Sequence, residues 1–442
     1  DKEVLHVVDR VGEFYCALYL TDDPTCTQTD QTWRLRIFDS EGAELRTVEM
    51  AELGMPARLD PSLSFSGDRQ TKSRTEFTLG SLSHSRQTFS IDLEAMRNQL
   101  SAGEDVASLP LDAMISARAA TAFVDLDPSK VGTHFEHVPG PEGTTLPVTY
   151  YWAKERPDGR IERFDDLPSH ANVQPYAYGS IGITRTPINE PGFRDLMERG
   201  VVIAYVGLPG GGYRGSESRD RGAYDRTLTI RAAAAVGHHL GERFPDGVRF
   251  FVGRSWGGWL AENIAALSAK TGKKAFDVYL SVVSAGGALR MIGVLLEQWA
   301  LHDFGARMGK RGEVSDAERE HALAQAKKTD TPSIFRGFVN AAARFFMPHQ
   351  REALGHLIVA PEKDDGRAEP GSSARSLYWL TRLLGTGPRV NAIVGDGGHG
   401  ARNHAKHVPL VYNRVLRDMG RTLGEHQPLS FDRTPEDPIR AR

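Results

Sequence analysis

The chain has 442 residues, of which 40% are hydrophobic and 25% are charged, and its formal net charge is -3. This length exceeds one ordinary hydrophobic core and predicts two domains, while the near-balance of charge, with no sustained basic face, argues against nucleic-acid binding. No stretch approaches the roughly 20 apolar residues of a membrane span, and a total of two cysteines, Cys16 and Cys26, excludes a disulfide framework.

Short β-type runs separated by turn residues fill residues 1–130. The alternation of apolar and polar side chains at residues 33–37 is typical of a half-buried antiparallel strand. Runs spaced about ten residues apart predict a β-rich domain or a few blades of a β-propeller, with no clear internal repeat. The expected strands cover residues 4–8, 14–20, 33–38, 74–79 and 88–93.

Residues 131–425 form the second expected domain, in which β and α patterns alternate from residue 146 onwards. This alternation predicts an α/β fold with a mostly parallel sheet covered on both faces. The expected strands cover residues 148–152, 173–178, 201–206, 248–252, 278–283, 357–360 and 390–394. The expected helices cover residues 227–243, 290–301, 316–328, 372–384 and 401–416. Residues 426–442, rich in Pro, Asp and Arg, are expected to form a C-terminal tail.

The segment Gly253-Arg254-Ser255-Trp256-Gly257-Gly258 lies between a predicted buried strand and a predicted helix. A Gly-x-Ser-x-Gly motif in this context is typical of a nucleophile elbow. The serine of such an elbow occupies a tight turn, so the flanking residues must be small for strand and helix to approach. The turn also points the free N–H groups of the helix N-terminus at developing negative charge. We therefore predict that Ser255 is a nucleophile.

A serine nucleophile needs a base and an orienting acid, which in an α/β-hydrolase follow it in the order acid, then histidine. His399 lies in a glycine-rich segment after the strand expected at 390–394 and is the candidate base. The acid remains open between Asp364 and Asp365, which follow the strand at 357–360, and Asp396.

A metal cluster is the alternative role for His399, together with His404 and His407. Because no acidic or cysteine ligand pattern accompanies these histidines, no metal site is expected.

Several motifs, in order, resemble those of the prolyl oligopeptidase family of serine peptidases across roughly residues 70–420. Residues 176–187 resemble the family's Tyr-Gly-Tyr-Gly-Gly-Phe segment that ends in Thr-Pro, and residues 200–215 resemble its strand and triple-glycine loop. Residues 253–258 correspond to its Gly-Gly-Ser-Asn-Gly-Gly elbow. Residues 365–370 resemble its Asp-Asp-Arg-Val-Val-Pro stretch, and residues 398–400 resemble its histidine loop.

The resemblance implies roles that the spacing leaves open. It favours Asp365 over Asp364 as the acid, since the arginine and proline that follow then align. It implies the hydroxyl of Tyr178 and the backbone N–H of Trp256 as oxyanion donors. It also implies a propeller, for which residues 1–130 are too few to form the family's seven blades, so either the propeller is truncated in this chain or these residues are its last blades plus a linker.

The resemblance further implies a substrate pocket containing Arg367, which would hold a substrate carbonyl, together with Trp299 and Ile181. This sequence departs from the family at several of these positions. Ile181 replaces the pocket phenylalanine, Ala368 replaces a valine, and Trp256 replaces the asparagine after the serine, which would place a large ring at the mouth of the site. These changes argue against strict proline specificity.

The sequence thus predicts a serine hydrolase of prolyl oligopeptidase type that cleaves short peptides through an acyl-enzyme. Ser255 is the nucleophile, His399 the base and Asp365 the orienting acid. An esterase or thioesterase on the same fold is the alternative that the altered pocket favours, and a non-catalytic binding protein is a third. The reaction requires no cofactor, and neither nucleic acid nor membrane is an expected partner.

The chain begins with Asp1 rather than Met, which predicts a processed or trimmed product whose targeting signal is out of view. The compartment therefore stays open, with the cytoplasm slightly favoured over the periplasm or secretion. The sequence gives no indication of the oligomeric state.

Overall fold

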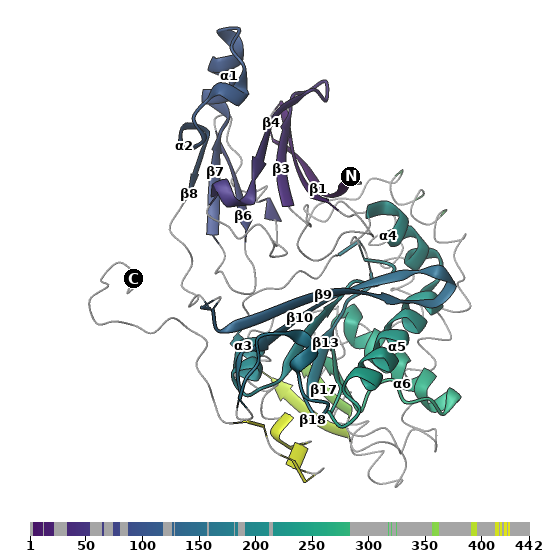
Figure 1. Cartoon of the computed structure of the whole chain (residues 1–442). Helices are drawn as coiled ribbons and strands as arrows, with labels where there is room; N and C mark the ends of the chain where they lie inside the picture. The colour runs from purple at the N-terminus through teal and green to yellow at the C-terminus, as the bar shows by residue number, and fades with distance from the viewer. Residues whose placement is uncertain are drawn as a thin grey trace. The chain divides into compact units, whose positions relative to one another are not determined.

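The computed structural model describes the chain as two units (Figure 1). The first unit holds the described residues up to Val131, and the second holds those from Gly132 onwards. The described residues are 3–11, 13–21, 33–53, 64–65, 74–79, 87–117, 126–127, 129–156, 159–180, 182–183, 191–211, 215–282, 317, 320, 324, 356–361, 390–395, 412–414, 416–417, 420–421 and 423–424.

The first unit contains two four-stranded antiparallel sheets in which strands consecutive along the chain are neighbours. One sheet is formed by β1 (Glu3–Val11), β2 (Phe14–Thr21), β3 (Trp33–Phe38) and β4 (Glu44–Glu49). The other is formed by β5 (Ser64–Phe65), β6 (Arg74–Leu79), β7 (Gln87–Asp92) and β8 (Ile115–Ala117). The antiparallel strands expected from alternation are therefore present, and the sequence pattern missed β4, β5 and β8.

Strand β7 ends one residue earlier than predicted because Asp92 caps a helix. Its side chain accepts hydrogen bonds from the N–H groups of Glu94 (3.1 Å) and Ala95 (3.0 Å), so Leu93 begins α1 (Leu93–Ser101) instead of ending the strand. The short helices η1 (Met50–Leu53), η3 (Val106–Ser108) and α2 (Leu111–Met114) complete the unit.

One hydrophobic core joins the two sheets and the helices of the first unit. Its buried members are Phe14, Cys16, Leu35, Ile37, Val48, Leu53, Phe89, Ile91, Leu93, Met96, Val106, Met114 and Ile115. Four-stranded antiparallel sheets packed in succession are the building units of a β-propeller. That this unit is part of a propeller stays a prediction.

The second unit is built on an eight-stranded sheet with the order β18-β17-β16-β15-β13-β14-β10-β9. The strands from β14 to β18 run parallel, and β10 pairs antiparallel with β14. The mostly parallel sheet predicted from the sequence is therefore present. Its strands are β9 (Val131–Pro139), β10 (Thr145–Ala153), β13 (Val173–Tyr176), β14 (Val202–Val206), β15 (Phe250–Arg254), β16 (Val278–Val282), β17 (His356–Pro361) and β18 (Val390–Gly395). Only β9 was not predicted.

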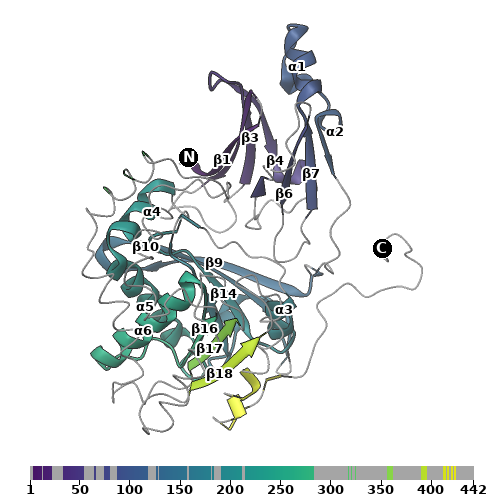
Figure 2. The same ribbon diagram turned by 180° about the vertical axis from the view of Figure 1, so that it is seen from behind.

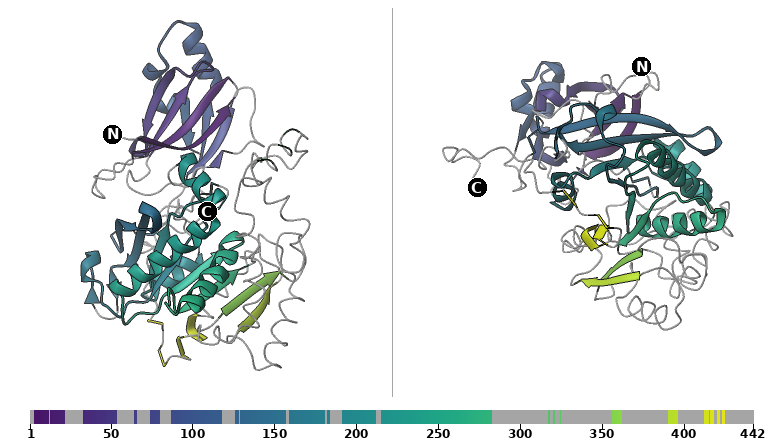
Figure 3. Two further views of the ribbon diagram at one scale, coloured as in Figure 1. Left: turned by 90° about the vertical axis from the view of Figure 1, so that its right-hand side faces the viewer. Right: turned by 60° about the horizontal axis from the view of Figure 1, so that its bottom comes forward.

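Helices cover both faces of this sheet, as Figures 1 and 2 show. On one face lie α5 (Arg226–Arg243) and α6 (Trp256–Thr271), which share a core with Phe251 of β15. Figure 3 (left) looks onto these two helices. The other face carries α3 (Pro191–Glu198) and the helical residues around Tyr412, whose ring stacks on Phe250 with the centroids 3.8 Å apart. The side chains of Phe250 and Phe251, which are consecutive in β15, thus pack on opposite faces of the sheet.

Smaller elements complete the second unit. These are η4 (Pro141–Gly143), the hairpin of β11 (Glu155–Arg156) and β12 (Gly159–Arg160), η5 (Phe164–Asp166) and α4 (Gly215–Tyr224). The helix predicted at 227–243 is α5, and described residues within 316–328 and 401–416 are helical. The helices predicted at 290–301 and 372–384 lie outside the described residues.

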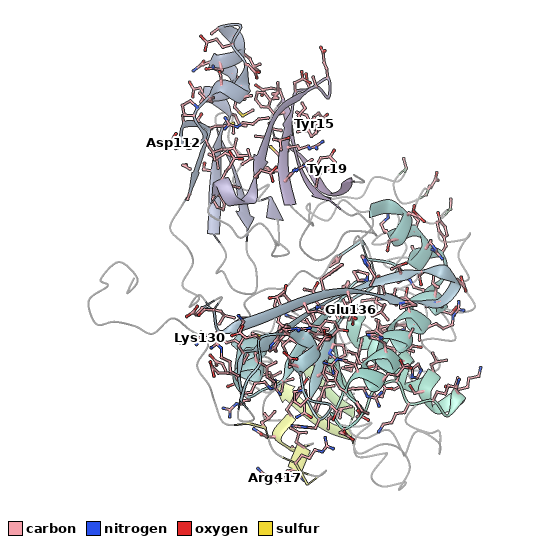
Figure 4. All side chains as sticks on the ribbon, in the orientation of Figure 1. Tyr15, Tyr19, Asp112, Lys130, Glu136 and Arg417 are labelled. Carbon is pink, nitrogen blue, oxygen red and sulfur yellow. The ribbon has the colours of Figure 1, made fainter. Side chains whose placement is uncertain are left out.

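A half-buried acid ties strand β9 to helix α5. Glu136 (labelled in Figure 4) accepts hydrogen bonds from the Tyr150 hydroxyl at 2.6 Å and from His239 Nε2 at 2.8 Å. Burial alone would raise the pKa of Glu136, but the bonds from His239 and Tyr150 bring it below its usual 4.5. The same bond raises the pKa of His239 above its usual 6.5, against the effect of burial.

This pair predicts a stability that depends on pH. The raised pKa of His239 adds stability below pH 6.5 that is lost as pH rises through the folded-state value. The lowered pKa of Glu136 adds stability above pH 4.5 that is lost as pH falls. Replacing His239→Gln should therefore reduce the free energy of unfolding most near pH 5.5, by about 1 kcal/mol, and less at pH 9, in urea titrations across pH.

The neighbouring His238 provides the control, because burial, followed by the charges of Arg249 and Lys273, lowers its pKa. A histidine of this kind makes the protein less stable as pH falls, so the His238→Gln difference should change with pH in the opposite direction. Equal pH dependence of the two variants would contradict the Glu136–His239 account.

Candidate active site

Ser255 occupies a strained turn between β15 and α6. Its backbone has φ 58° and ψ -118°, a conformation that residues other than glycine rarely adopt. Its N–H donates to the carbonyl of Val282 at the end of β16 (2.9 Å), and its own carbonyl accepts from the N–H of Gly258 (2.9 Å). The strand, turn and helix expected from the Gly-x-Ser-x-Gly motif are present at the expected residues.

The two glycines of the motif are there for steric reasons. A Cβ atom on Gly253 would lie 1.8 Å from the carbonyl oxygen of Gly257, so no larger residue fits while α6 starts where it does. A Cβ on Gly257 would lie 2.8 Å from the carbonyl oxygen of Ala177 and 3.8 Å from Cδ2 of Tyr178. The glycines therefore let the start of α6 approach both its own strand and the segment after β13.

The turn lies at the point where the order in which strands are added to the sheet reverses. Between β13 and β14 the chain passes through α3 on one face, whereas between β15 and β16 it passes through α6 on the other. Strands β13 and β15 are neighbours, with Tyr176 opposite Val252. In open α/β sheets ligands bind at the carboxyl ends of the strands at such a switch point. Ser255 directly follows β15, and Tyr178 lies just beyond β13, so both are at this place.

The segment after β13 brings Tyr178 against the start of α6. Its side chain is 7% exposed, and it lies beside Gly257 as described above. The next residue, Gly179, has φ +64°, and a Cβ there would lie 2.6 Å from Cγ2 of Thr229 on α5. The position of Tyr178 is thus fixed by close packing between two helices, which is what an oxyanion donor would need.

The sequence led us to expect the ring of Trp256 at the mouth of the site. This expectation is wrong, because the ring is buried. It is 7% exposed and belongs to the core, where it stacks on Trp259 with the ring centroids 4.6 Å apart. Side chains at successive helical positions point in different directions, and the first turn of α6 directs this one inward. The backbone N–H of Trp256 stays at the N-terminus of the helix, beside Ser255.

Arg226 is a residue of the site that sequence reasoning missed. Its side chain is 1% exposed and starts α5, directly after the N-cap Asp225. Its guanidinium lies 4.8 Å from the centroid of the Trp256 ring, and Nη1 donates to the carbonyl of Gly179 at 3.3 Å. Burial lowers the pKa of Arg226 to about 9, so the side chain is still a cation at neutral pH. Asp followed by Arg and Thr is typical of an exposed helix start, and no motif marks the position as buried.

The glycine-rich loop after β14 joins the same cluster. Gly210 has φ +91°, and a Cβ there would lie 2.4 Å from the carbonyl oxygen of Gly179. The Thr229 hydroxyl donates to the carbonyl of Pro209 (2.8 Å), and the N–H of Gly182 donates to that of Gly210 (3.0 Å). The loops after β13 and β14 are thereby held together by the first turn of α5.

The remaining predicted site residues lie outside the described residues: Asp365, His399, Arg367, Trp299 and Ile181, with the alternatives Asp364, Asp396, His404 and His407. The strands that precede two of them are described. β17 ends at Pro361 and β18 at Gly395, and both run parallel to β16. The chain therefore leaves these strands, toward Asp365 and His399, at the sheet edge that carries Ser255.

The described residues contain neither a metal-binding cluster nor a membrane-spanning helix. No three His, Cys, Asp or Glu side chains there come together in a way that could hold a metal ion. No helix there combines the length and apolar character needed to cross a membrane.

Known structures share this fold. A prolyl endopeptidase matches 94% of this chain over 53% of its own length, with a TM-score of 0.60 and 17% identity. Prolyl oligopeptidase B from Galerina marginata matches 95% of this chain over 52% of its length when bound to a 35mer hydrolysis and macrocyclization substrate (TM-score 0.59, 15% identity). The same enzyme bound to a 25mer macrocyclization substrate matches 96% over 51% (TM-score 0.61, 15% identity).

This chain therefore has a prolyl oligopeptidase-like fold and spans about half the length of the structures it matches. The resemblance predicted from the motifs is confirmed at the level of the fold. No protein-family model and no curated protein matches the sequence.

The strain at Ser255 makes a prediction about stability. Both Ser255→Ala and Ser255→Gly remove the hydroxyl, but only glycine relieves the positive φ. We expect the glycine variant to be more stable than the alanine variant by about 1 kcal/mol, because the relief of strain exceeds the extra entropy of glycine in the unfolded chain. Urea unfolding of both variants measures this difference. At Glu242, within α5, the same pair should show the opposite order; alanine as the more stable residue at both positions would contradict a strained turn.

Proposed function

We propose that this protein is a serine hydrolase of prolyl oligopeptidase type that cleaves short peptides through an acyl-enzyme. The observation that carries the proposal is the strained turn at Ser255, which lies between β15 and α6 at the switch point of the sheet. A positive φ at a residue with a Cβ is a conformation that proteins retain mainly where function requires it. The fold likeness to prolyl oligopeptidases is in accord with this assignment.

In the proposed mechanism Ser255 Oγ attacks the carbonyl carbon of the scissile amide, and its proton passes to His399. Asp365 holds the imidazole in the required tautomer and stabilises the imidazolium. The negative oxygen of the tetrahedral intermediate accepts hydrogen bonds from the N–H of Trp256 and the hydroxyl of Tyr178. The C–N bond then breaks, and the amine leaves with the proton from His399. Water, activated by His399, hydrolyses the acyl-enzyme and restores Ser255.

The ends of the strands support this division of roles. Strands β17 and β18 lie on the β16 side of β15 and run parallel to it, so they end at the same carboxyl edge of the sheet, which is in accord with an acid and a base that follow these strands in the chain. Tyr178 follows β13, on the opposite side of β15. The substrate carbonyl would then lie between the donors on one side and the base on the other.

Two four-stranded antiparallel sheets make up the N-terminal unit. We propose that they are blades of a β-propeller, and that the restriction to short peptides follows from the prolyl oligopeptidase type. Prolyl oligopeptidase B is bound in these structures to a 35mer hydrolysis and macrocyclization substrate and to a 25mer macrocyclization substrate. Capture of the acyl-enzyme by an amine in place of water is therefore a second fate to examine for this chain.

The side chains proposed for the substrate pocket favour a second candidate function. Arg367 and Trp299 would bind the substrate beside Ile181, which stands where the family has phenylalanine. A smaller aliphatic residue makes the pocket less selective for the proline ring, and an ester needs less protonation of its leaving group than an amide does. An esterase or thioesterase with the same triad is the alternative, and a non-catalytic binding protein is the third.

Labelling with a fluorophosphonate tests the nucleophile. The Ser255 oxygen should bond to phosphorus and displace fluoride, while the serine proton passes to His399. Peptide mapping should find the label on Ser255, and Ser255→Ala should abolish it. His399→Ala should slow labelling by at least about a hundredfold. A folded wild-type protein that stays unlabelled would favour the binding-protein alternative.

The type of substrate is tested by comparing turnover of matched amides and esters. A peptidase should cleave proline-containing peptide anilides with a kcat/KM within about a hundredfold of the corresponding esters, because His399 protonates the amine in the transition state. Rapid ester hydrolysis with no detectable amide hydrolysis would assign the esterase function. Both functions proceed through an acyl-enzyme on Ser255, so the proposed role of Ser255 does not depend on which substrate is preferred.

A further inference from the structure

Arg226 occupies a position that is unfavourable for a cation in two respects. It is 1% exposed, so its charge has lost its contact with water. It is also the first residue of an 18-residue helix, where the partial positive charge of the helix N-terminus repels it. Burial accordingly lowers its pKa to about 9. A cation in such a place indicates a role that outweighs the loss of stability.

The contacts of Arg226 link both segments that carry the proposed oxyanion donors. The Nη1 hydrogen bond ends on the carbonyl of Gly179, the residue after Tyr178, and the guanidinium carbon lies over the ring of Trp256, the residue after Ser255. Gly210 lies beside the same nitrogen, since a Cβ there would be 3.2 Å from Nη1. Arg226 is thus in contact with the segments that follow β13, β14 and β15.

We propose that Arg226 is a positioning residue that sets the geometry of the oxyanion hole by holding the Tyr178 segment and the Trp256 ring against the start of α5. This role rests on the proposed function, since it acts through Tyr178 and the Trp256 N–H. A planar guanidinium can stack on an indole and donate a hydrogen bond in its own plane at once, which a lysine ammonium cannot do.

The charge of Arg226 adds an electrostatic contribution to this geometry. The guanidinium cation is held at the carbonyl of Gly179, the residue after Tyr178, so negative charge that develops beside this segment is favoured by the cation. In a site shielded from water such a contribution is larger than it would be in solution. An oxyanion bound at the Tyr178 hydroxyl would therefore form more readily with Arg226 in place.

The conservative variant Arg226→Lys tests the proposal, because it retains a buried cation but removes the stacking and the Nη1 bond. The matched control is Arg243→Lys at the other end of α5, about 25 Å away along the helix. Arg243 has contacts of the same kind, since it lies 5.0 Å from the Phe164 ring centroid and donates to the carbonyls of Phe164 and Leu167. Both variants therefore remove an arginine–aromatic contact from α5, but only Arg226→Lys removes one beside Ser255.

The measurement is the second-order rate constant for fluorophosphonate labelling of Ser255 in the full chain. Arg226→Lys should lower it by about tenfold or more, and Arg243→Lys by less than about twofold. Thermal unfolding of both proteins shows that labelling is measured on folded protein. Equal labelling rates in wild type and Arg226→Lys would overturn the proposal.

A double-mutant cycle with Tyr178→Phe separates positioning from simple stabilisation. If Arg226 acts through the oxyanion hole, Arg226→Lys should lower the labelling rate at least threefold less in the Tyr178→Phe background than in wild type. The same reduction in both backgrounds would mean a structural role and would overturn the proposal. A wild-type chain that does not label at all would instead refute the proposed function, so the two failures are distinguishable.

Discussion

The close approach of strand β15 to the first turn of α6 is the constraint on which the candidate site depends. A Cβ on Gly253 would lie only 1.8 Å from the Gly257 carbonyl oxygen, and with strand and helix this close the chain reverses direction within one residue. That residue is Ser255, and the reversal places it at φ 58°. Ser255 and the free N–H groups at the start of α6 then lie at the carboxyl edge of the sheet. A looser connection would remove the strain and would also separate the serine from the helix N-terminus.

The same small residues bring together segments that are far apart in the chain. Gly257 admits the Ala177 carbonyl, and Gly210 admits the Gly179 carbonyl, so the loops after three neighbouring strands come into contact. At these two glycines no side chain separates the segments, and their mutual positions depend on backbone packing and on the side chains of Thr229 and Arg226. A positioning role of this kind gives a reason for a cation in a buried position at the start of a helix.

The sequence predicted those parts of the fold that local patterns determine. Short apolar or alternating runs identified most strands of the two units, and Gly253, Ser255 and Gly257 predicted the turn because its geometry requires these residue types. Strand β9 was missed because its sequence, VGTHFEHVP, contains neither a continuous apolar run nor a regular alternation, and the end of β7 was misjudged because the Asp92 cap competes with strand pairing. The inward direction of the Trp256 ring and the burial of Arg226 depend on tertiary packing between α5 and α6, to which no local pattern responds. The assignments of His399 and Asp365 stay predictions from the motifs.

The most direct test of this account is a crystal structure of the protein after reaction with a fluorophosphonate. We predict a phosphonyl group on Ser255 Oγ, with its phosphoryl oxygen about 2.7–3.1 Å from both the Trp256 N–H nitrogen and the Tyr178 hydroxyl. Arg226 should remain stacked on the Trp256 ring, and His399 should face the adduct. A phosphoryl oxygen that points away from both donors, or an adduct on another serine, would contradict the proposed site.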